Sequence, residues 1–320
     1  MAPRFFGYER EIADELTRRG ASVDFVLDRP FDTPLLKAVT RFHRGLVIKA
    51  ADRYYDEQLK GLGSIQYDYV FVVNGQTLSD TTLANWKTSF PNAAFVLYMW
   101  DSFGNRRWVI DNLKYFDHVF SFDKGDVKKY GLHFRPLFFG EGFESQANCG
   151  KQWDLSFIGT AHTDRFFVIS KVAKNLGPNT TTFFYLYLQA KWVFWLYKAI
   201  NPSFRHASPE DFKFQSIDKK TVQDVFNASA CILDVEHPKQ TGLTMRTLET
   251  LGASKKLVTT NKSVLEYDFF DSRNICVINR STPVIPPEFL STPYHPVDPD
   301  IYSRYKLEGW MDEILEVTQR

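Results

Sequence analysis

Short apolar runs alternate along the chain with longer stretches in which apolar residues recur every three or four positions. This alternation is typical of parallel strands joined by helices that cover the sheet. In residues 8–19, Tyr8, Ile12 and Leu16 stand four apart among charged residues, and Gly20 follows. The pattern therefore predicts a helix there, followed by strands at 23–27, 69–73, 94–99 and 118–122.

A second set of the same kind begins after residue 153. It predicts strands at 154–158, 231–235, 256–260 and 274–278, helices at 164–175, 219–228 and 242–251, and a helical tail over 301–317. Residues 140–153 are polar and without period, which is typical of a linker. The expected fold class is thus α/β, with two Rossmann-like domains, 1–139 and 154–320, that face each other across a cleft and end in a C-terminal helix.

The start of the chain departs from that pattern. A doubly wound domain normally opens with a strand, a glycine loop and a helix, but here Phe5-Phe6-Gly7 leads into the helix with almost no strand before it. We expect the first strand to be either missing or only a stub.

Composition narrows the function classes. Lys and Arg total 39 against 38 Asp and Glu, so the net charge of +1 gives no general field for nucleic acid. Three cysteines, far apart and without a CxxC pair, predict neither a disulfide framework nor a zinc knuckle. No apolar leader is visible near Met1, and we expect a cytoplasmic chain.

The segment 183–200 is nearly as long and apolar as a membrane span, but Gln189, Lys191 and Lys198 interrupt it. Its first half predicts a buried strand, and its second half a helix with Trp192, Trp195 and Leu196 on one side. Two interpretations remain open, which are core packing and contact with a membrane surface, where Trp, Tyr and Lys suit the headgroup layer.

The stretch 233–261 carries the most specific chemistry, in the order strand, polar loop, helix and strand. Gly242, Arg246 and Glu249 are predicted to share one helix face, while Met245, Leu248 and Leu251 form the buried face. A glycine and free N–H groups at the start of a helix favour the binding of a phosphate. An arginine can add a bidentate contact to that phosphate, and a glutamate nearby can accept hydrogen bonds from a sugar diol. The alternative is an ordinary surface pair of Arg246 with Glu249.

These residues resemble the donor-site signature of GT-B glycosyltransferases. Gly242, Glu249, Leu251-Gly252 and the strand 256–260 carry the resemblance. The runs HPKQTGLTMRTLETLG, FFGYEREIADEL and LYMWDS are similar to bacterial lipopolysaccharide and capsule transferases of this fold. The resemblance implies a glycosyltransferase that moves a sugar from a nucleotide-activated donor to a hydroxyl of a surface glycan or lipid-linked saccharide.

Carried over to this chain, the resemblance implies that Glu249 holds the ribose, Arg246 the phosphate, and the main chain of Gly242, Leu243 and Thr244 the donor's phosphate or sugar. Thr241 stands where many retaining members have a glutamate, so the stereochemical outcome is not predicted. The His237-Pro238 pair is similar to transferases that use cytidine-monophosphate sugars, which leaves the nucleotide open.

Loops that follow the predicted strands supply the remaining candidates, because ligands bind beyond the carboxyl ends of parallel strands. Further donor contacts are expected from Gly159, Thr160, Arg165 and Lys239. Acceptor contacts are expected from Gly7, Tyr8, Asn74 and Gln76. Catalytic roles are expected for Asp101 as a base, for Glu9, and for His237 as a donor to the leaving oxygen. The structural alternatives are a helix N-cap for Asp101, dipole compensation for Glu9 and a solvated helix face for Arg165.

The sequence contains no DxD after a strand, no HExxH, no phosphate-binding P-loop and no GxSxG. We therefore expect a metal-independent reaction without a cofactor, no nucleic-acid partner, and peripheral contact with the cytoplasmic face of the inner membrane. Two alternatives remain, which are an epimerase or phosphorylase of the same fold and a non-catalytic nucleotide-sugar-binding scaffold in polysaccharide assembly.

Overall fold

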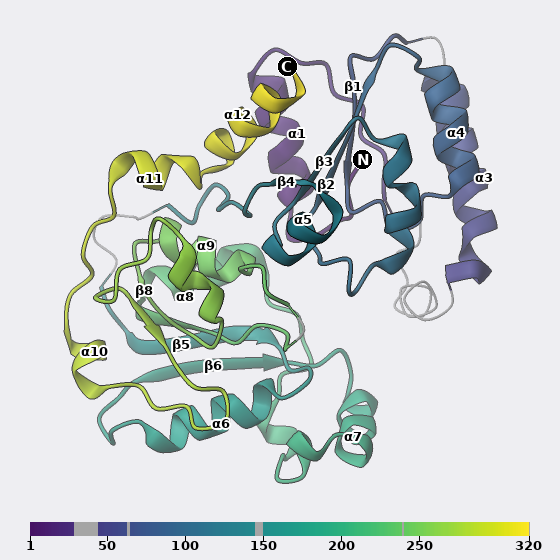
Figure 1. Cartoon of the computed structure of the whole chain (residues 1–320). Coiled ribbons are helices and arrows are strands. Elements are labelled where there is room, and N and C mark those ends of the chain that lie inside the picture. Colours follow the sequence, from purple (N-terminus) through teal and green to yellow (C-terminus); the bar gives the residue numbers. More distant parts are fainter. Residues whose placement is uncertain (29–43, 63–64, 145–149, 239, 320) are drawn as a thin grey trace. The chain divides into compact units, whose positions relative to one another are not determined.

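The computed structural model describes the chain except for residues 29–43, 63–64, 145–149, 239 and 320 (Figure 1). It separates into two compact units, of which the first comprises Met1–Pro136 with Trp310–Arg320 and the second Leu137–Gly309. The C-terminal tail differs from the sequence-based boundaries, which placed it in the second domain. Trp310 is fully buried in the first unit, where its ring centroid lies 4.7 Å from that of Tyr98 and 6.1 Å from that of Phe71.

The first unit is built on a parallel sheet of order β1-β2-β3-β4. Its strands are β1 (Tyr69–Val73), β2 (Ala94–Met99), β3 (His118–Ser121) and β4 (His133–Phe134). Its helices are α1 (Tyr8–Arg18), α3 (Arg44–Leu62), α4 (Asp80–Ser89), the 3₁₀ helix η1 (Arg107–Tyr115), α5 (Lys124–Tyr130) and most of α12 (Leu307–Thr318). The predicted helix at 8–19 and three of the four predicted strands are confirmed.

The first strand of this unit is a stub. The Met1 amine donates to Phe71 O at 2.6 Å, and Val73 N donates to Met1 O at 2.9 Å. On its other side, Ala2 pairs with the segment 26–28 through a single parallel bridge. The first two residues therefore lie between that segment and β1, and the strand predicted at 23–27 is wrong except for this bridge.

The second unit has a parallel sheet of order β6-β5-β7-β8-β9. Its strands are β5 (Trp153–Thr160), β6 (Thr182–Tyr187), β7 (Ser229–Asp234), β8 (Lys256–Thr259) and β9 (Ile275–Val277). Its helices are α6 (Arg165–Asn175), α7 (Lys191–Ile200), α8 (Lys219–Asn227), α9 (Met245–Gly252), α10 (Pro287–Ser291) and α11 (Pro299–Arg304), with the 3₁₀ turns η2 (Pro202–Phe204), η3 (Pro209–Asp211) and η4 (Lys262–Glu266).

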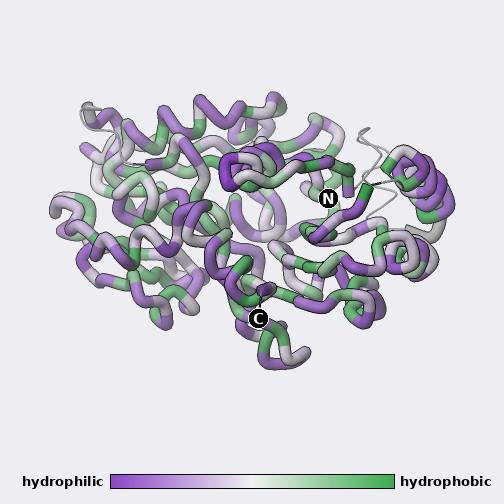
Figure 2. The backbone as a smooth tube through the Cα atoms, turned by 90° about the horizontal axis from the view of Figure 1, so that it is seen from above, coloured by the Kyte–Doolittle hydropathy of each residue, from purple (hydrophilic) through white to green (hydrophobic). Residues whose placement is uncertain are grey.

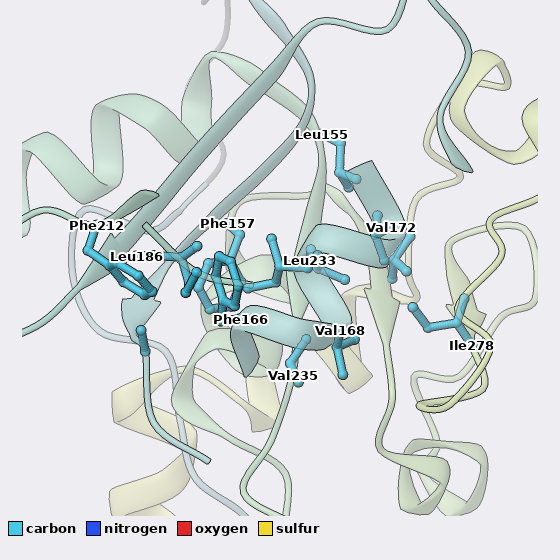
Figure 3. Close-up of a cluster of buried hydrophobic side chains, with 14 of the residues drawn as sticks. Leu155, Phe157, Phe166, Val168, Val172, Leu186, Phe212, Leu233, Val235 and Ile278 are labelled. Atoms are coloured by element: carbon cyan, nitrogen blue, oxygen red, sulfur yellow. The ribbon is translucent and has the colours of Figure 1, made fainter. Parts of the chain in front are cut away.

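Burial follows the apolar runs of the strands. Figure 3 shows Leu155 and Phe157 of β5 and Leu233 of β7 against Val168 and Val172 of α6. Figure 2 shows short hydrophobic stretches separated by hydrophilic ones along the chain. Parallel strands buried on both faces need such continuous apolar runs, so the α/β fold class predicted from the sequence is confirmed.

The segment 183–200 divides as predicted, into β6 and α7. The helix predicted at 242–251 begins later, at Met245, because the side chain of Thr244 accepts from Thr247 N at 3.3 Å and caps the helix. Gly242 thus lies in the preceding loop and does not share a helix face with Arg246 and Glu249.

Candidate functional site

The strand order of the second sheet reverses at β5, which has β6 on one side and β7 on the other. In open parallel sheets the loops diverge at such a switch point, and ligands bind beyond the carboxyl ends of the two strands. Here these ends are Gly159-Thr160 of β5 and the residues from Asp234 to His237 that end and follow β7. The candidate donor site of the second unit therefore lies at this edge.

Asp234, the last residue of β7, is fully buried and holds the start of α9. Its carboxylate accepts from Thr244 Oγ1 at 2.7 Å and from Thr247 Oγ1 at 3.1 Å. Arg246 Nη1 lies 3.3 Å from the other oxygen. Because Thr244 is the N-cap of α9, these bonds fix the amino end of the helix, with its positive dipole end, beside β7.

The guanidinium of Arg246 is turned towards the end of β5. It donates to Ile158 O, lies 5.1 Å from the ring centroid of Phe157, and leaves 17% of the side chain exposed. A Cβ added to Gly159 would be 3.1 Å from Arg246 Nη2, so a glycine suits this close approach. Arg246 thus forms an internal ion pair with Asp234, and its contact with a donor phosphate stays a prediction.

Arg165 joins the loops that follow β5 and β7. This first residue of α6 is 9% exposed, and it donates from Nε to Val235 O at 2.6 Å and from Nη1 to Thr160 O at 3.1 Å. Burial lowers the pKa of Arg165 to about 10, and the charge of Arg246 acts in the same direction. The alternative of a solvated helix face is therefore wrong for Arg165.

A cluster around Arg280 escaped the sequence reasoning. Arg280 binds Asp164 at 2.7 Å and Glu236 at 2.5 Å, and it also donates to Glu236 O at 2.6 Å. Thr260 donates a hydrogen bond to the carboxylate of Glu236. Burial raises the pKa of Glu236. These residues come from four different loops and share no local pattern, so only the folded chain brings them together.

The loop that leads into α9 is held by amides. Asn261 Nδ2 donates to Gly242 O at 3.2 Å, and Gln240 Nε2 donates to the same oxygen at 3.0 Å. Gly242 and Leu243 are buried, whereas Thr244 is half-buried. Main-chain contacts to a donor, as predicted for Gly242 and Leu243, would have to reach groups in this buried loop.

The other predicted donor and catalytic residues of this unit fall in or near the same edge. His237 follows β7, and its ring centroid lies 5.6 Å from that of His162 in the loop after β5. Glu249 lies within α9 and is 9% exposed. Lys239 is outside the described residues.

In the first unit, the corresponding edge lies beyond the Met1–Ala2 stub and β1. Gly7 and Asn74 both have a left-handed backbone, with φ of 80° and 67°. Tyr8, Asn74 and Gln76 are all buried, and Asn74 Oδ1 accepts from Trp100 N at 3.3 Å. Their burial leaves little of the predicted acceptor residues accessible.

Exposed aromatic rings occupy this edge instead. Phe5 and Phe6 are 45% and 51% exposed, and their ring centroids lie 5.0 Å apart. The ring of Trp100, at the end of β2, lies 5.9 Å from that of Phe5. Phe6 has a φ of 52°, a strained conformation for a bulky residue. The signal was visible in the sequence, because Phe5-Phe6 immediately precedes Gly7 at the first helix.

The predicted catalytic carboxylates of the first unit both have partners. Asp101 accepts from Asn105 Nδ2 at 3.1 Å and pairs with Arg106 at 2.9 Å. The helix that follows begins at Arg107, so Asp101 is not its N-cap. Glu9, in the first turn of α1, is 6% exposed and accepts from Phe5 N at 3.1 Å. A catalytic role for either carboxylate stays a prediction.

A cavity of about 420 Å³ lies in the first unit. It is lined by the residues before and within β1, by residues 20–26, and by mostly apolar side chains of α1, α3 and α12. Met1 and Ala2 also line the cavity. Glu9, one of the candidate catalytic residues, lines it too, so the cavity reaches the first turn of α1.

In the part of the chain that the structure describes, no three His, Cys, Asp or Glu side chains are grouped so that they could hold a metal ion. None of the helices among the described residues has the length and apolar character needed to cross a bilayer.

Comparison with known proteins identifies the fold. No protein-family profile and no curated protein matches the chain. Several solved structures, however, are similar to it in fold. HepE of Anabaena, in complex with UDP and glucose, is similar with a TM-score of 0.58 at 10% identity over 96% of this chain and 88% of that one. A glycosyltransferase from Rickettsia africae has a TM-score of 0.56 at 10% identity, over 100% of this chain and 96% of that one. The apo form of the lipopolysaccharide outer core galactosyltransferase WaaB has 0.53 at 11% identity, over 99% and 98%. The chain thus has the GT-B fold that its sequence predicted.

Proposed function

We propose that this chain is a glycosyltransferase that moves a sugar from a nucleotide-activated donor to a hydroxyl of a surface-glycan or lipid-linked saccharide. One observation carries the proposal, which is the switch point of the second unit. There Asp234 fixes the start of α9 beside β7, and Arg165 and Arg246 lie at the carboxyl ends of β5 and β7. The likeness to HepE, solved with UDP-glucose, supports a nucleotide-sugar donor.

In this proposal the donor's phosphates lie against the amino end of α9. The main-chain groups of Gly159, Thr160, Gly242, Leu243 and Thr244 approach them, and the exposed part of the Arg246 guanidinium adds a charged contact. Arg165 does not contact the donor directly in this proposal, because its side chain is buried and already donates to two carbonyls. It holds the loops after β5 and β7 together. Glu249 accepts from the ribose diol.

The chemical step is attack by an acceptor hydroxyl on the anomeric carbon of the donor. The bond between that carbon and the phosphate oxygen breaks, and the nucleotide leaves with the electron pair. Asp101 or Glu9 takes the hydroxyl proton, while His237 donates to the leaving oxygen. The fixed dipole end of α9 and the arginines stabilise the charge that develops there.

The first unit presents the acceptor in this proposal. Gly7, Tyr8, Asn74 and Gln76 form the edge, and the exposed rings of Phe5 and Phe6 offer an apolar platform to a saccharide. Aromatic rings contribute large contact areas at binding sites, and neither ring is needed to fill a core. The proposed enzyme is cytoplasmic, where it takes up the nucleotide-sugar donor, and it meets a lipid-linked acceptor at the cytoplasmic face of the inner membrane.

A thermal-shift screen against nucleotides and nucleotide sugars tests the donor site, because a ligand that binds only the folded state raises the melting temperature. We expect one nucleotide class to stabilise the chain by about 2.7 kcal/mol at 100 times its Kd. Glu249→Gln should abolish the shift in melting temperature. Glu288 is an exposed residue of α10, and Glu288→Gln should leave the shift unchanged.

Activity separates the enzyme from its rivals. Release of free nucleotide from the stabilising donor, dependent on a saccharide acceptor, is the expected result. Donor binding without any turnover would favour a nucleotide-sugar-binding scaffold, and interconversion of the donor without an acceptor would favour an epimerase. A folded chain that no nucleotide stabilises would refute the donor assignment.

A further inference from the structure

Helix α7 presents an apolar face to solvent. Its exposed residues Trp192, Trp195, Leu196 and Ile200 are 69%, 60%, 45% and 66% exposed. Trp195, Leu196 and Ile200 follow Trp192 by three, four and eight positions, so all four lie on one side of the helix. A surface helix normally turns its apolar stripe inward and its polar residues outward, but α7 also turns these four apolar side chains outward.

The other side of α7 already anchors the helix. Val193 and Phe194 are buried, and the ring centroid of Phe194 lies 5.5 Å from that of Phe212. The ring centroid of Tyr197 lies 5.2 Å from that of Phe204. The ring of Trp195 also touches that of Phe194, with centroids 5.1 Å apart, but both tryptophans stay more than half exposed. A cluster of large apolar side chains at the surface indicates a partner.

The charge of α7 indicates which partner. Lys191 and Lys198 are its charged residues, and the helix contains no Asp or Glu. They stand seven positions apart, so both lie along the same flank of the apolar face. Lys198 Nζ also donates to Ala207 O and lies 5.6 Å from the ring centroid of Phe194. Exposed tryptophans and aliphatic residues with lysines beside them are the composition that suits the interfacial layer of an anionic bilayer.

The position of α7 connects this face with the candidate site. Figure 1 shows α7 at the periphery of the second unit, on the side to which β6 points. Asn201, which directly follows α7, donates from Nδ2 to Thr163 O at 2.7 Å. Thr163 belongs to the loop after β5, between Thr160 and the Arg165 that joins the two site loops. A surface bound by α7 would thus lie near the edge where the donor is proposed to bind.

We infer that α7 is a membrane-docking helix whose face of Trp192, Trp195, Leu196 and Ile200 inserts into the headgroup layer of an anionic phospholipid surface. This inference rests on the proposed function in one respect, because a lipid-linked acceptor would be found at such a surface. The lysines strengthen the attraction, and the helix lies in the plane of the interface without crossing it.

Flotation of the purified full chain with phospholipid vesicles tests the inference. With vesicles of phosphatidylcholine and about 30% phosphatidylglycerol, the chain should float, and tryptophan emission should shift to the blue. The variant Trp192→Ala with Trp195→Ala should lose at least about tenfold in partitioning. The matched control, Leu265→Ala with Val284→Ala, removes two other exposed apolar residues of the same unit and should float as the parent does.

Three results would overturn the inference. One is a parent chain that stays in the aqueous fraction with anionic vesicles, and another is a tryptophan variant that floats as well as the parent. Self-association by light scattering that the tryptophan substitutions abolish, without vesicle binding, would identify the face as a contact between copies of the chain.

The donor screen keeps this test separate from the proposed function. The tryptophan variant should retain the full nucleotide-dependent thermal shift, because Trp192 and Trp195 are exposed and neither is among the residues proposed to bind the donor. Vesicle binding without any nucleotide shift would sustain the docking helix and refute the donor site. A nucleotide shift without vesicle binding would do the opposite.

Discussion

Replacement of Asp234 by alanine should strongly destabilise the second unit. The substitution removes the acceptor of two threonine hydroxyls, at 2.7 and 3.1 Å, and leaves the Arg246 guanidinium without its carboxylate. Hydrogen bonds to a charged group contribute about 1.5–3 kcal/mol each, and breaking a buried pair from one side costs about 3–5 kcal/mol. Because the contributions overlap, we expect a total loss of about 3–5 kcal/mol rather than their sum.

Urea denaturation followed by fluorescence measures this loss. With a slope of about 2 kcal/mol per M for a unit of this size, the midpoint should fall by roughly 1.5–2.5 M. Asp234→Asn keeps an acceptor for the hydroxyls and should lose less, about 1–2 kcal/mol. If the two units unfold in separate transitions, only that of the second unit should move.

A surface pair provides the control for Asp234. Asp224 binds Lys220 at 2.5 Å on α8, but both side chains are more than half exposed. Asp224→Ala should therefore change the free energy of unfolding by less than about 0.5 kcal/mol. If Asp234→Ala were no more destabilising than Asp224→Ala, the reasoning that α9 is fixed to β7 through this carboxylate would be refuted.

Three further predictions concern other parts of the chain. Burial lowers the pKa of the Met1 amine from 8.0 to about 6, so between pH 6 and 8 the unfolded chain holds more protons, and stability should rise by up to about 3 kcal/mol across that window. Urea titrations at several pH values should show this rise, and an acetylated amine should remove it. In Gly252→Ala the new Cβ would lie 2.6 Å from the Phe139 ring, and thermal melts should show a loss of about 1–3 kcal/mol, against less than about 0.5 for Gly177→Ala, whose Cβ has ordinary space. Burial raises the pKa of the Cys231 thiol, which should resist iodoacetamide in the folded chain; its alkylation at the rate of the partly exposed Cys276, mapped by mass spectrometry, would contradict this.

The strands could be predicted because each buried strand is a local apolar run. β1 and β2 coincide with the predicted ranges, and the others differ by a few residues at their ends. The strand prediction at 23–27 was wrong because the pairing partner of this segment is a stub of two residues, and pairing cannot be read from one strand alone. The tail failed for a similar reason, since only the folded chain shows that Trp310 packs between Tyr98 and Phe71.

The candidate site was predictable where the signal is local. The loops after β5 and β7 could be located from the sequence because they follow apolar runs, and their role in binding the donor stays a prediction. The start of α9 was misplaced although Thr244, a favourable N-cap, was visible. Arg165 was expected either to contact the donor or to lie on a solvated helix face, and its burial depends on carbonyls 5 and 70 positions away. The Arg280 cluster spans up to 116 positions and has no local signature.

The cavity beside Met1 and Ala2 has a consequence for handling the protein. Residues 20–26 line it on one side and β1 on another, with both apolar and polar side chains. Unpaired strand edges act as templates on which extended segments of other chains can add. We therefore expect concentrated samples to aggregate through this opening, by a strand of one molecule inserted into the sheet of the next.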